Sequence, residues 1–263
     1  MNNFKFLSAS NTKEAIKLSS SKSKFLAGGM TLIPAIKLRL ASYSNLINIK
    51  KIKNLNGIKV LRKSLRIGST TTHSDVSSSE EIKKIIPSIA KLAEGIGDPQ
   101  VRNRGTIGGS IANNDPAADY PAACLALKTI IHTSSRKISS DKFFIGMFET
   151  SLRKNELIEA IEFEIPEKSS YEKYPNPASR YAVVGVFVAK YNSEIRVAIT
   201  GAESCVFRSN EIETALSNSF SPTSIENINI SKKGLNSDIH ASDEYRAHII
   251  KVMAKKAISN CLD

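Results

Sequence analysis

Cysteine is scarce in this chain of 263 residues, and tryptophan is absent. The three cysteines, Cys124, Cys205 and Cys261, are odd in number and widely separated. The sequence therefore predicts neither a disulfide framework nor a cysteine-rich metal cluster. This usage fits a reducing compartment, and we expect a cytoplasmic protein.

Long apolar runs are also missing. The first six residues lack the apolar stretch of a signal peptide. No later segment offers about 18 uninterrupted apolar residues, the length that a membrane-spanning helix needs, so we expect no stable membrane insertion. The histidines show no metal-ligand spacing, and each is assigned a structural or surface role: His73, His132, His240 and His248.

Basic residues exceed acidic ones by 37 to 25, which gives a formal net charge of +12. This charge is compatible with a nucleic-acid partner, an anionic membrane surface or a solvated exterior. The basic residues are spread along the chain, and aromatic residues make up only 6% of it. A nucleic-acid surface would show clustered basic residues with interleaved aromatics, so we favour the solvated exterior and expect no nucleic-acid partner.

The first half of the chain alternates between strand-like and helix-like segments. Asn11 and Glu14 form a plausible capping box for a helix that ends at Leu18. Next come an apolar strand, a helix with an early proline and a second strand, which together form a βαβ pattern. These segments are residues 24–27, 34–40 and 46–49. A hairpin over 57–72 and helices over 79–86 and 89–94 follow.

The second half begins with a segment rich in Gly, Asn and Asp, residues 95–119, which we interpret as a loop. Asp115 and Pro116 resemble the start of a helix over 117–127. Four segments then resemble strands of a mainly antiparallel sheet, at 129–132, 157–165, 181–191 and 195–202. Helices are expected over 211–216 and 243–262, and residues 217–242 are expected to be mostly loop. Prolines suggest a domain change at 165–178.

The segment AGGMTLIP, residues 27–34, lies between an expected strand and an expected helix. Gly28 and Gly29 permit positive φ angles and let a ligand approach the backbone closely. Consecutive N–H groups near a helix start can hold a pyrophosphate. An ordinary strand-to-helix turn uses similar residues, so this segment alone leaves both interpretations open.

A second glycine-rich segment, QVRNRGTIGGSIANNDPAAD, occupies residues 100–119. Gly105, Gly108 and Gly109 fall within five positions and have Thr, Ser and Asn neighbours, so the segment can wrap around a polar ligand. Its spacing differs from the GxGxxG of a Rossmann turn. This difference argues against NAD binding by a doubly wound fold.

Together the two segments resemble the FAD-binding medium subunits of the molybdenum hydroxylases. This family includes carbon monoxide dehydrogenase, xanthine dehydrogenase and related aldehyde and heterocycle hydroxylases. The similarity covers nearly the whole chain, through RYAVVG at residues 180–185 to Tyr245 and Arg246, and residues 100–119 are its most specific part.

The resemblance implies an α+β fold of the PCMH-type FAD-binding class. It implies a FAD-binding domain over residues 1–170, made of an N-terminal α/β subdomain at about 1–55 and a mainly antiparallel-sheet α+β subdomain at about 56–170. A small C-terminal α+β domain, residues 171–263, would resemble the C-terminal domain of the carbon monoxide dehydrogenase flavoprotein.

The resemblance also implies where FAD binds. Residues 27–33 would surround the pyrophosphate, and Thr106, Gly108 and Gly109 would grip it from the other side. Asn113 and Asp119 would lie along the ribityl or adenosine portion. The strand after Arg180 would pass near the isoalloxazine ring. No histidine or cysteine context for covalent attachment is present, so we expect non-covalent FAD. The residues expected at the cofactor are Ala27, Gly28, Gly29, Met30, Thr31, Leu32, Ile33, Thr106, Gly108, Gly109, Asn113, Asp119 and Tyr181.

Several of these residues have structural alternatives. Asp119 could instead be a first-turn acid that stabilises a helix dipole, and Asp115 is better interpreted as a helix cap. Tyr181 could be a core or edge-strand aromatic. Arg102 and Arg104 could balance phosphate charge or be solvated loop residues.

The resemblance implies an electron relay. A large partner subunit would oxidise the substrate at a molybdenum cofactor, and a small partner subunit with iron–sulfur clusters would pass electrons to the FAD of this chain. We expect no catalytic residue and no metal ligand in this chain itself. The alternatives are a stand-alone FAD-dependent reductase and, less favoured, a nucleic-acid-binding protein.

Overall fold

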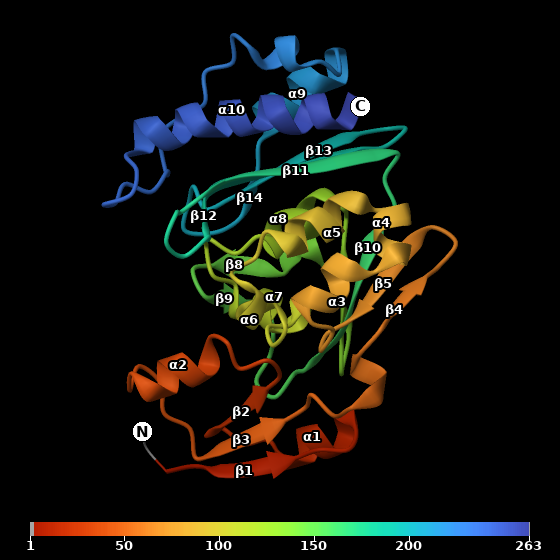
Figure 1. Cartoon of the computed structure of the whole chain (residues 1–263), viewed down its shortest axis with the longest axis vertical. Coiled ribbons are helices and arrows are strands. Elements are labelled where there is room, and N and C mark those ends of the chain that lie inside the picture. The colour runs from red at the N-terminus through yellow and green to blue at the C-terminus, as the bar shows by residue number, and fades with distance from the viewer. Residues whose placement is uncertain (1–2, 263) are drawn as a thin grey trace.

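In the computed structural model, which describes residues 3–262, the three larger β-sheets are stacked along the long axis of the molecule (Figure 1), and β8 and β9 form a separate two-stranded sheet. The lowest layer is a parallel sheet in the order β1-β3-β2. Its elements are β1 (Lys5–Ser8), α1 (Thr12–Leu18), β2 (Ser23–Leu26), α2 (Leu32–Lys37) and β3 (Asn45–Asn48). The expected βαβ unit is confirmed, and β1 adds a strand that the sequence did not predict.

The cap of α1 forms through side chains, but not as a full capping box. Asn11 accepts a hydrogen bond from the Glu14 backbone N–H at 2.9 Å. The Glu14 carboxylate reaches the backbone N–H of Ser10 at 2.7 Å instead of that of Asn11. The helix therefore begins where the sequence predicted, with the reciprocal bond displaced by one residue.

The middle layer is an antiparallel sheet in the order β4-β5-β10-β6-β7, with helices packed against it (Figure 1). Its core contains Leu65, Ile67, Ile131, Ile161 and Phe163, all fully buried. The expected hairpin is confirmed as β4 and β5, and the expected helices as α4 and α5. The elements are η1 (Lys53–Leu55), β4 (Ile58–Val60), β5 (Ser64–Gly68), α3 (His73–Ser78), α4 (Glu80–Ile85), α5 (Pro87–Glu94), β6 (Ile130–Thr133), β7 (Lys137–Ser139), η2 (Ser140–Lys142), β8 (Phe144–Gly146), β9 (Glu149–Thr150) and β10 (Ile158–Glu164).

The sequence suggested that the glycine-rich segment is a loop. The structure instead contains two short helices there. These are α6 (Pro99–Arg102) and α7 (Ile107–Asn113). Asp98 caps α6 and Thr106 caps α7, where its hydroxyl accepts a hydrogen bond from the Gly109 N–H at 3.1 Å. Glycine weakens a helix interior more than a capped first turn, so Gly108 and Gly109 are compatible with helix here.

The next helix, α8 (Tyr120–Ala126), begins later than expected. Asp115 does not cap it. Its carboxylate accepts a hydrogen bond from the Ala117 N–H at 3.0 Å and organises a turn before the helix. Asp119 occupies the N-cap position, but its side chain makes no capping bond.

The four strands expected in one sheet are divided between two sheets. β6 and β10 belong to the middle layer, whereas β12 and β13 belong to a separate sheet in the order β11-β12-β13-β14. Its first strand, β11, was not predicted because prolines punctuate this region. An edge strand tolerates proline, and Pro175 ends one here. The elements are β11 (Lys168–Pro175), β12 (Ala182–Lys190), β13 (Ile195–Thr200) and β14 (Phe207–Arg208).

The top layer consists of this sheet and the helices that cover it (Figure 1): α9 (Asn210–Asn218), η3 (Pro222–Ile225) and α10 (Asp243–Leu262). The expected helix at 243–262 is confirmed, and it buries a face against its own sheet. Ile249 and Met253 of this helix are buried, whereas Tyr245 and Lys256 are exposed. The α+β class is confirmed.

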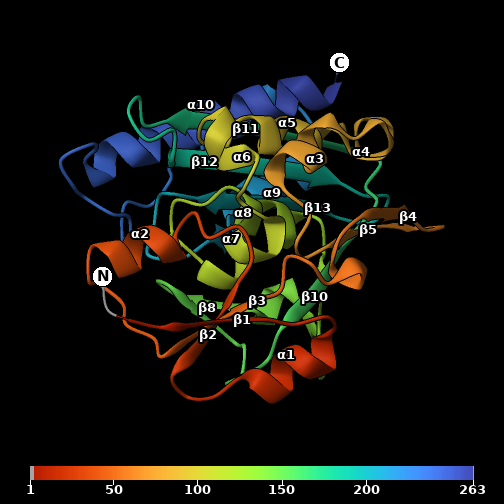
Figure 2. The same ribbon diagram turned by 60° about the horizontal axis from the view of Figure 1, so that its bottom comes forward.

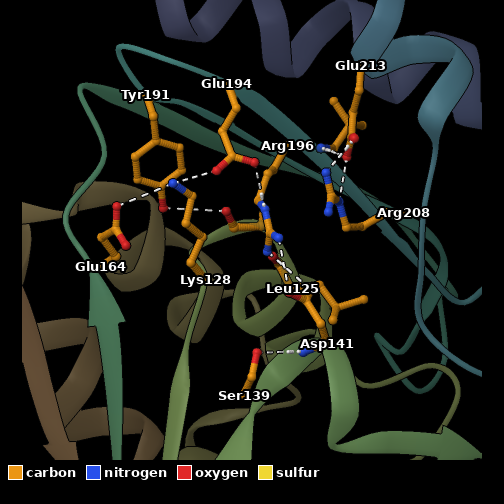
Figure 3. Close-up of polar contacts among 12 residues, drawn as sticks. Leu125, Lys128, Ser139, Asp141, Glu164, Tyr191, Glu194, Arg196, Arg208 and Glu213 are labelled. Carbon is orange, nitrogen blue, oxygen red and sulfur yellow. Dashed lines mark hydrogen bonds and ion pairs between the residues drawn. The ribbon is translucent and has the colours of Figure 1, made fainter.

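Polar contacts fix the top sheet to the middle layer (Figure 3). Arg196 of β13 is only 8% exposed. It donates hydrogen bonds to the Leu125 carbonyl at 2.8 Å and to both carboxylate oxygens of Asp141 at 3.2 and 3.0 Å. Nearby, the Lys128 ammonium pairs with Glu194 at 2.6 Å and lies 3.9 Å from the centroid of the Tyr191 ring. These contacts hold two sheets that share no strand.

We predict that Arg196→Leu lowers the free energy of unfolding by about 2 kcal/mol, because the buried Leu125 carbonyl loses its charged donor. Urea unfolding at pH 7 measures the difference. Arg62→Leu is the control, since Arg62 is exposed and should change stability by about 0.5 kcal/mol or less. Equal effects of the two substitutions would contradict this role for Arg196.

Candidate cofactor-binding site

A cavity of about 850 Å³ lies where the N-terminal sheet meets the middle layer. Its lining comes from the end of β2, from α7, from residues 148–158 and from Tyr181. Figure 2 brings the N-terminal sheet forward in front of the middle layer. The volume is within the range of about 300–1,000 Å³ that is usual for small-molecule and cofactor sites. Ligands commonly bind at the carboxyl ends of parallel strands. The carboxyl end of the parallel strand β2 lines this cavity.

The loop after β2 offers the cavity a row of backbone donors. Within the part of the chain that the structure describes, the N–H groups of residues 28–32 have no hydrogen-bond acceptor. Gly29 has a φ of +78°, which favours glycine because a Cβ is strained there. Successive free N–H groups in such a turn form an anion-binding concavity. This loop can therefore bind a pyrophosphate.

Gly28 lies directly against the second glycine-rich segment. A Cβ on Gly28 would overlap the carbonyl of Arg104 and would lie 2.8 Å from the Cα of Gly105. Only glycine permits this approach. The two segments recognised in the sequence are therefore in contact, and they form one continuous wall.

The first turn of α7 presents a different surface. The N–H groups of Ile107 and Gly108 donate to the carbonyls of Thr71 and Ser69, and that of Gly109 donates to Thr106. A Cβ on Gly108 would lie 2.6 Å from the Ser69 carbonyl oxygen, whereas a Cβ on Gly109 would meet only the Thr106 hydroxyl, at 2.9 Å. Gly108 thus serves packing. Gly109 is exposed, and because it has no side chain its backbone faces the cavity uncovered.

Asp119 is 5% exposed and lines the cavity. Its carboxylate accepts a hydrogen bond from the Tyr171 hydroxyl and pairs with the Lys173 ammonium at 3.0 Å. Burial raises the pKa of this carboxyl, and the contacts with Lys173 and Tyr171 oppose the rise. The side chain therefore ties α8 to β11 at the edge of the cavity.

The arginines of the second segment lie in different surroundings. Arg102 donates to the carbonyls of Ile96 and Gly97, each at 3.0 Å, and so shapes the cavity wall that those residues form. Arg104 is exposed and is not part of the cavity lining. Tyr181 is 44% exposed at the rim. It follows Arg180, whose φ is +62°.

All but one of the residues expected at the cofactor line this cavity; the exception is Ile33, which packs near Gly29. The lining also contains residues that the sequence did not single out, notably His73, Ile96 and all of residues 148–158 except Ser151. Residues 148–158 carry no glycine motif and reach the cavity through the β9–β10 connection. No local signal in the sequence could have identified them.

Two buried polar side chains hold the 148–158 wall in place. The Asn114 amide donates to the carbonyls of Gly146 and Glu149, both at 2.8 Å. Glu156 accepts hydrogen bonds from Arg136 at 3.0 Å and from the Arg153 backbone N–H at 2.7 Å. These bonds connect the wall to α7 and to the β6–β7 turn.

Comparison with known proteins identifies the family. Residues 2–168 match the family described as the FAD binding domain in molybdopterin dehydrogenase. The chain belongs to this family. It is 34% identical to the glyceraldehyde dehydrogenase medium chain of Sulfolobus acidocaldarius, over 97% of this chain and 96% of that protein. It is also 34% identical to the carbon monoxide dehydrogenase medium chain of Hydrogenophaga pseudoflava, over 78% and 77% of the two chains.

Solved structures agree with this assignment. A chain of carbon monoxide dehydrogenase from Hydrogenophaga pseudoflava superposes with a TM-score of 0.90 at 30% identity, over 99% of this chain and 98% of that chain. The resemblance inferred from the two glycine-rich segments is confirmed, as is the fold class. This FAD-binding medium subunit thus shares its architecture with subunits of oxidoreductases. The free N–H groups of residues 28–32 and the open backbone of Gly109 fit an extended, doubly phosphorylated cofactor.

Among residues 3–262, no cluster of three or more His, Cys, Asp or Glu side chains is arranged to hold a metal ion. In the same range, no helix is both long enough and apolar enough to cross a membrane.

We predict that Glu156→Gln lowers the free energy of unfolding by about 2 kcal/mol at pH 7. Burial opposes ionisation of Glu156, but hydrogen bonds from Arg136, the Arg153 N–H, Thr133 and Ser135 lower its pKa to about 2. A lowered folded-state pKa contributes stability above the unfolded-state pKa of about 4.3. This contribution is lost as the pH falls towards 2.

The measurement is urea unfolding of both proteins at pH 7 and pH 3, where the difference between them should shrink. Glu80→Gln is the control, because Glu80 is exposed and pairs only with Lys83 on the surface. A difference for Glu156→Gln that does not depend on pH would contradict the assignment.

Proposed function

We propose that this chain is the FAD-binding electron-transfer subunit of a molybdenum hydroxylase complex. The observation that carries the proposal is the cavity, which both glycine-rich segments line and which lies within the part matched by the FAD-binding family. Bound FAD accepts electrons singly or in pairs. The chain itself binds the cofactor, orients it and excludes water from one side of it.

The N–H groups of residues 28–32 donate to the pyrophosphate, and Ala27 and Ile33 hold the two ends of that loop. Thr106, Gly108 and Gly109 form the opposite wall, where the bare backbone of Gly109 lets the cofactor approach. Asn113 and Asp119 lie along the ribityl or adenosine portion, where a carboxylate accepts bonds from hydroxyls. Tyr181 lies at the flavin end. FAD is held non-covalently.

Two partners complete the proposed relay: a large molybdopterin-binding subunit that oxidises the substrate and a small iron–sulfur subunit that passes electrons to this chain. The relatives support this arrangement, since they are medium chains or subunits, including the nicotine 6-hydroxylase medium subunit of Paenarthrobacter nicotinovorans, 30% identical over 97% of this chain. An external acceptor then takes the electrons. The complex is proposed to contain two copies of each subunit.

We further propose that residues 1–170 form the FAD-binding domain and residues 171–263 the C-terminal domain. The family match ends at residue 168, where β11 begins, and so supports a boundary in this region. A cytoplasmic location is also proposed, because all three cysteines are free thiols.

The purified chain should bind one FAD, and Gly109→Val should weaken binding about 100-fold, or by about 2.8 kcal/mol. The added side chain would occupy the surface that the cofactor approaches. Gly146→Val is the matched control, since a Cβ there meets nothing closer than 3.7 Å and Gly146 is not in the cavity lining. Gly108→Val is less informative because it also disturbs packing against Ser69.

Fluorescence titration measures the affinity, and acid or heat release should yield FAD with the spectrum of the unmodified cofactor. The proposal fails if the chain binds FMN in preference to FAD, carries covalent flavin or has no affinity for FAD. Near-normal affinity of a folded Gly109→Val variant would remove α7 from the site.

The isolated chain should not oxidise aldehydes, purines or carbon monoxide, because the proposed substrate chemistry belongs to the large subunit. Co-expression with both partner subunits should give flavin reduction when substrate is added, as followed by bleaching of the flavin absorbance. Substrate-driven reduction by the isolated chain, or NAD(P)H oxidation by it with turnover, would favour the alternative of a stand-alone reductase.

A further inference from the structure

His73, the first residue of α3, lines the cavity although it is only 5% exposed. The Nε2–Cδ2 edge of its ring lies against Gly105, where a Cβ would be 2.7 Å from Nε2. The Tyr120 ring packs on the imidazole with the centroids 5.4 Å apart. His73 thus lies in the wall formed where the two glycine-rich segments meet.

The imidazole Nδ1 has no hydrogen-bond partner among residues 3–262. The hydroxyls of Ser69, Thr70 and Tyr120 are likewise buried without a hydrogen bond, and of these four residues His73 and Ser69 line the cavity. Buried polar groups are nearly always hydrogen-bonded, and an exception calls for an explanation. Because both residues lie at a ligand cavity, the explanation we favour is a polar ligand.

We propose that His73 is a further cofactor-binding residue, whose imidazole bonds to the diphosphate of the bound dinucleotide and takes up a proton from solvent when that diphosphate binds. The inference rests on the proposed function. The free N–H groups of residues 28–32 place the diphosphate on the loop whose Gly28 contacts Arg104 and Gly105. His73 lies on the other side of Gly105.

Burial and the neighbouring charges set the protonation state of the His73 ring before the ligand binds. Burial first, and then the Arg102 guanidinium, lower the pKa of His73 to about 4. On α3 itself, Asp75 is hydrogen-bonded to Thr72. α5 packs here with apolar side chains such as Ile89 and Leu92, and α8 contributes Tyr120. The imidazole is therefore neutral at pH 7 in the free chain.

A diphosphate is an anion, and a nearby anion favours the charged form of an imidazole. Binding thus raises the pKa of His73. By linkage, FAD binds more tightly as the pH falls through the bound-state pKa towards the free-state value, and affinity changes by up to about tenfold per pH unit in that window.

The first experiment measures the His73 pKa in the intact chain by ¹⁵N-edited NMR, between pH 5 and pH 8. We expect a ring that stays neutral in the free protein and titrates at higher pH with FAD bound. ADP, which carries the diphosphate without flavin, should raise the pKa, whereas riboflavin, which has no phosphate, should not. A His73 pKa that is unchanged by FAD, or raised by riboflavin, would overturn the inference.

The second experiment compares FAD affinity in two variants. His73→Phe keeps a ring without nitrogen and should bind FAD about tenfold more weakly at pH 6. His73→Gln keeps a neutral polar group, and both variants should lose the pH dependence. His248→Gln is the control, because His248 is exposed on α10, and it should bind FAD like the wild type. Unaltered pH dependence in a folded His73→Gln protein would also overturn the inference.

The outcomes separate the two proposals. If the wild-type chain fails to bind FAD, the proposed function itself fails. If it binds FAD with an affinity that does not change with pH, or with a His73 pKa that does not move, only the role of His73 fails. The NMR measurement on the wild type tests that role even if a variant does not fold.

Discussion

The contact between Gly28 and the backbone at Arg104 and Gly105 is the constraint on which the site depends. A β-carbon at position 28 would overlap the Arg104 carbonyl, so the N-terminal sheet reaches the middle layer only because this residue has no side chain. The approach joins a loop with free N–H groups to the start of α7. Without it, the two glycine-rich segments would border a gap and not a shared cavity.

A second constraint attaches the top sheet to this cavity. Asp119 is buried and would be costly to bury alone, but the Tyr171 hydroxyl and the Lys173 ammonium compensate its charge. Both partners lie on β11. Gly185 of the neighbouring strand leaves room for the Tyr171 side chain, which a Cβ there would displace. The ion pair therefore sets how β11 meets α8, and with it the position of the cavity rim.

The cavity combines two kinds of surface, and the division suits an extended cofactor. The loop after β2 offers unpaired donors, whereas the donors of Ile107, Gly108 and Gly109 are used within the protein. The unpaired donors therefore lie on one wall, and the backbone N–H groups at the start of the opposite wall are already hydrogen-bonded. The role proposed for His73 places one polar group in the wall between them.

Much of the site was determined by sequence that is local. The two glycine-rich segments can be recognised from residues that are adjacent in the sequence. The family resemblance rests on these segments, which contain Gly28, Gly29 and residues 100–119. The tertiary structure decided the rest. The helical form of 107–113 depends on the Thr106 cap, and residues 148–158 and His73 enter the site through contacts that are distant in sequence. Whether a donor is free or a histidine is buried depends on what packs against it, and a sequence pattern does not contain that information.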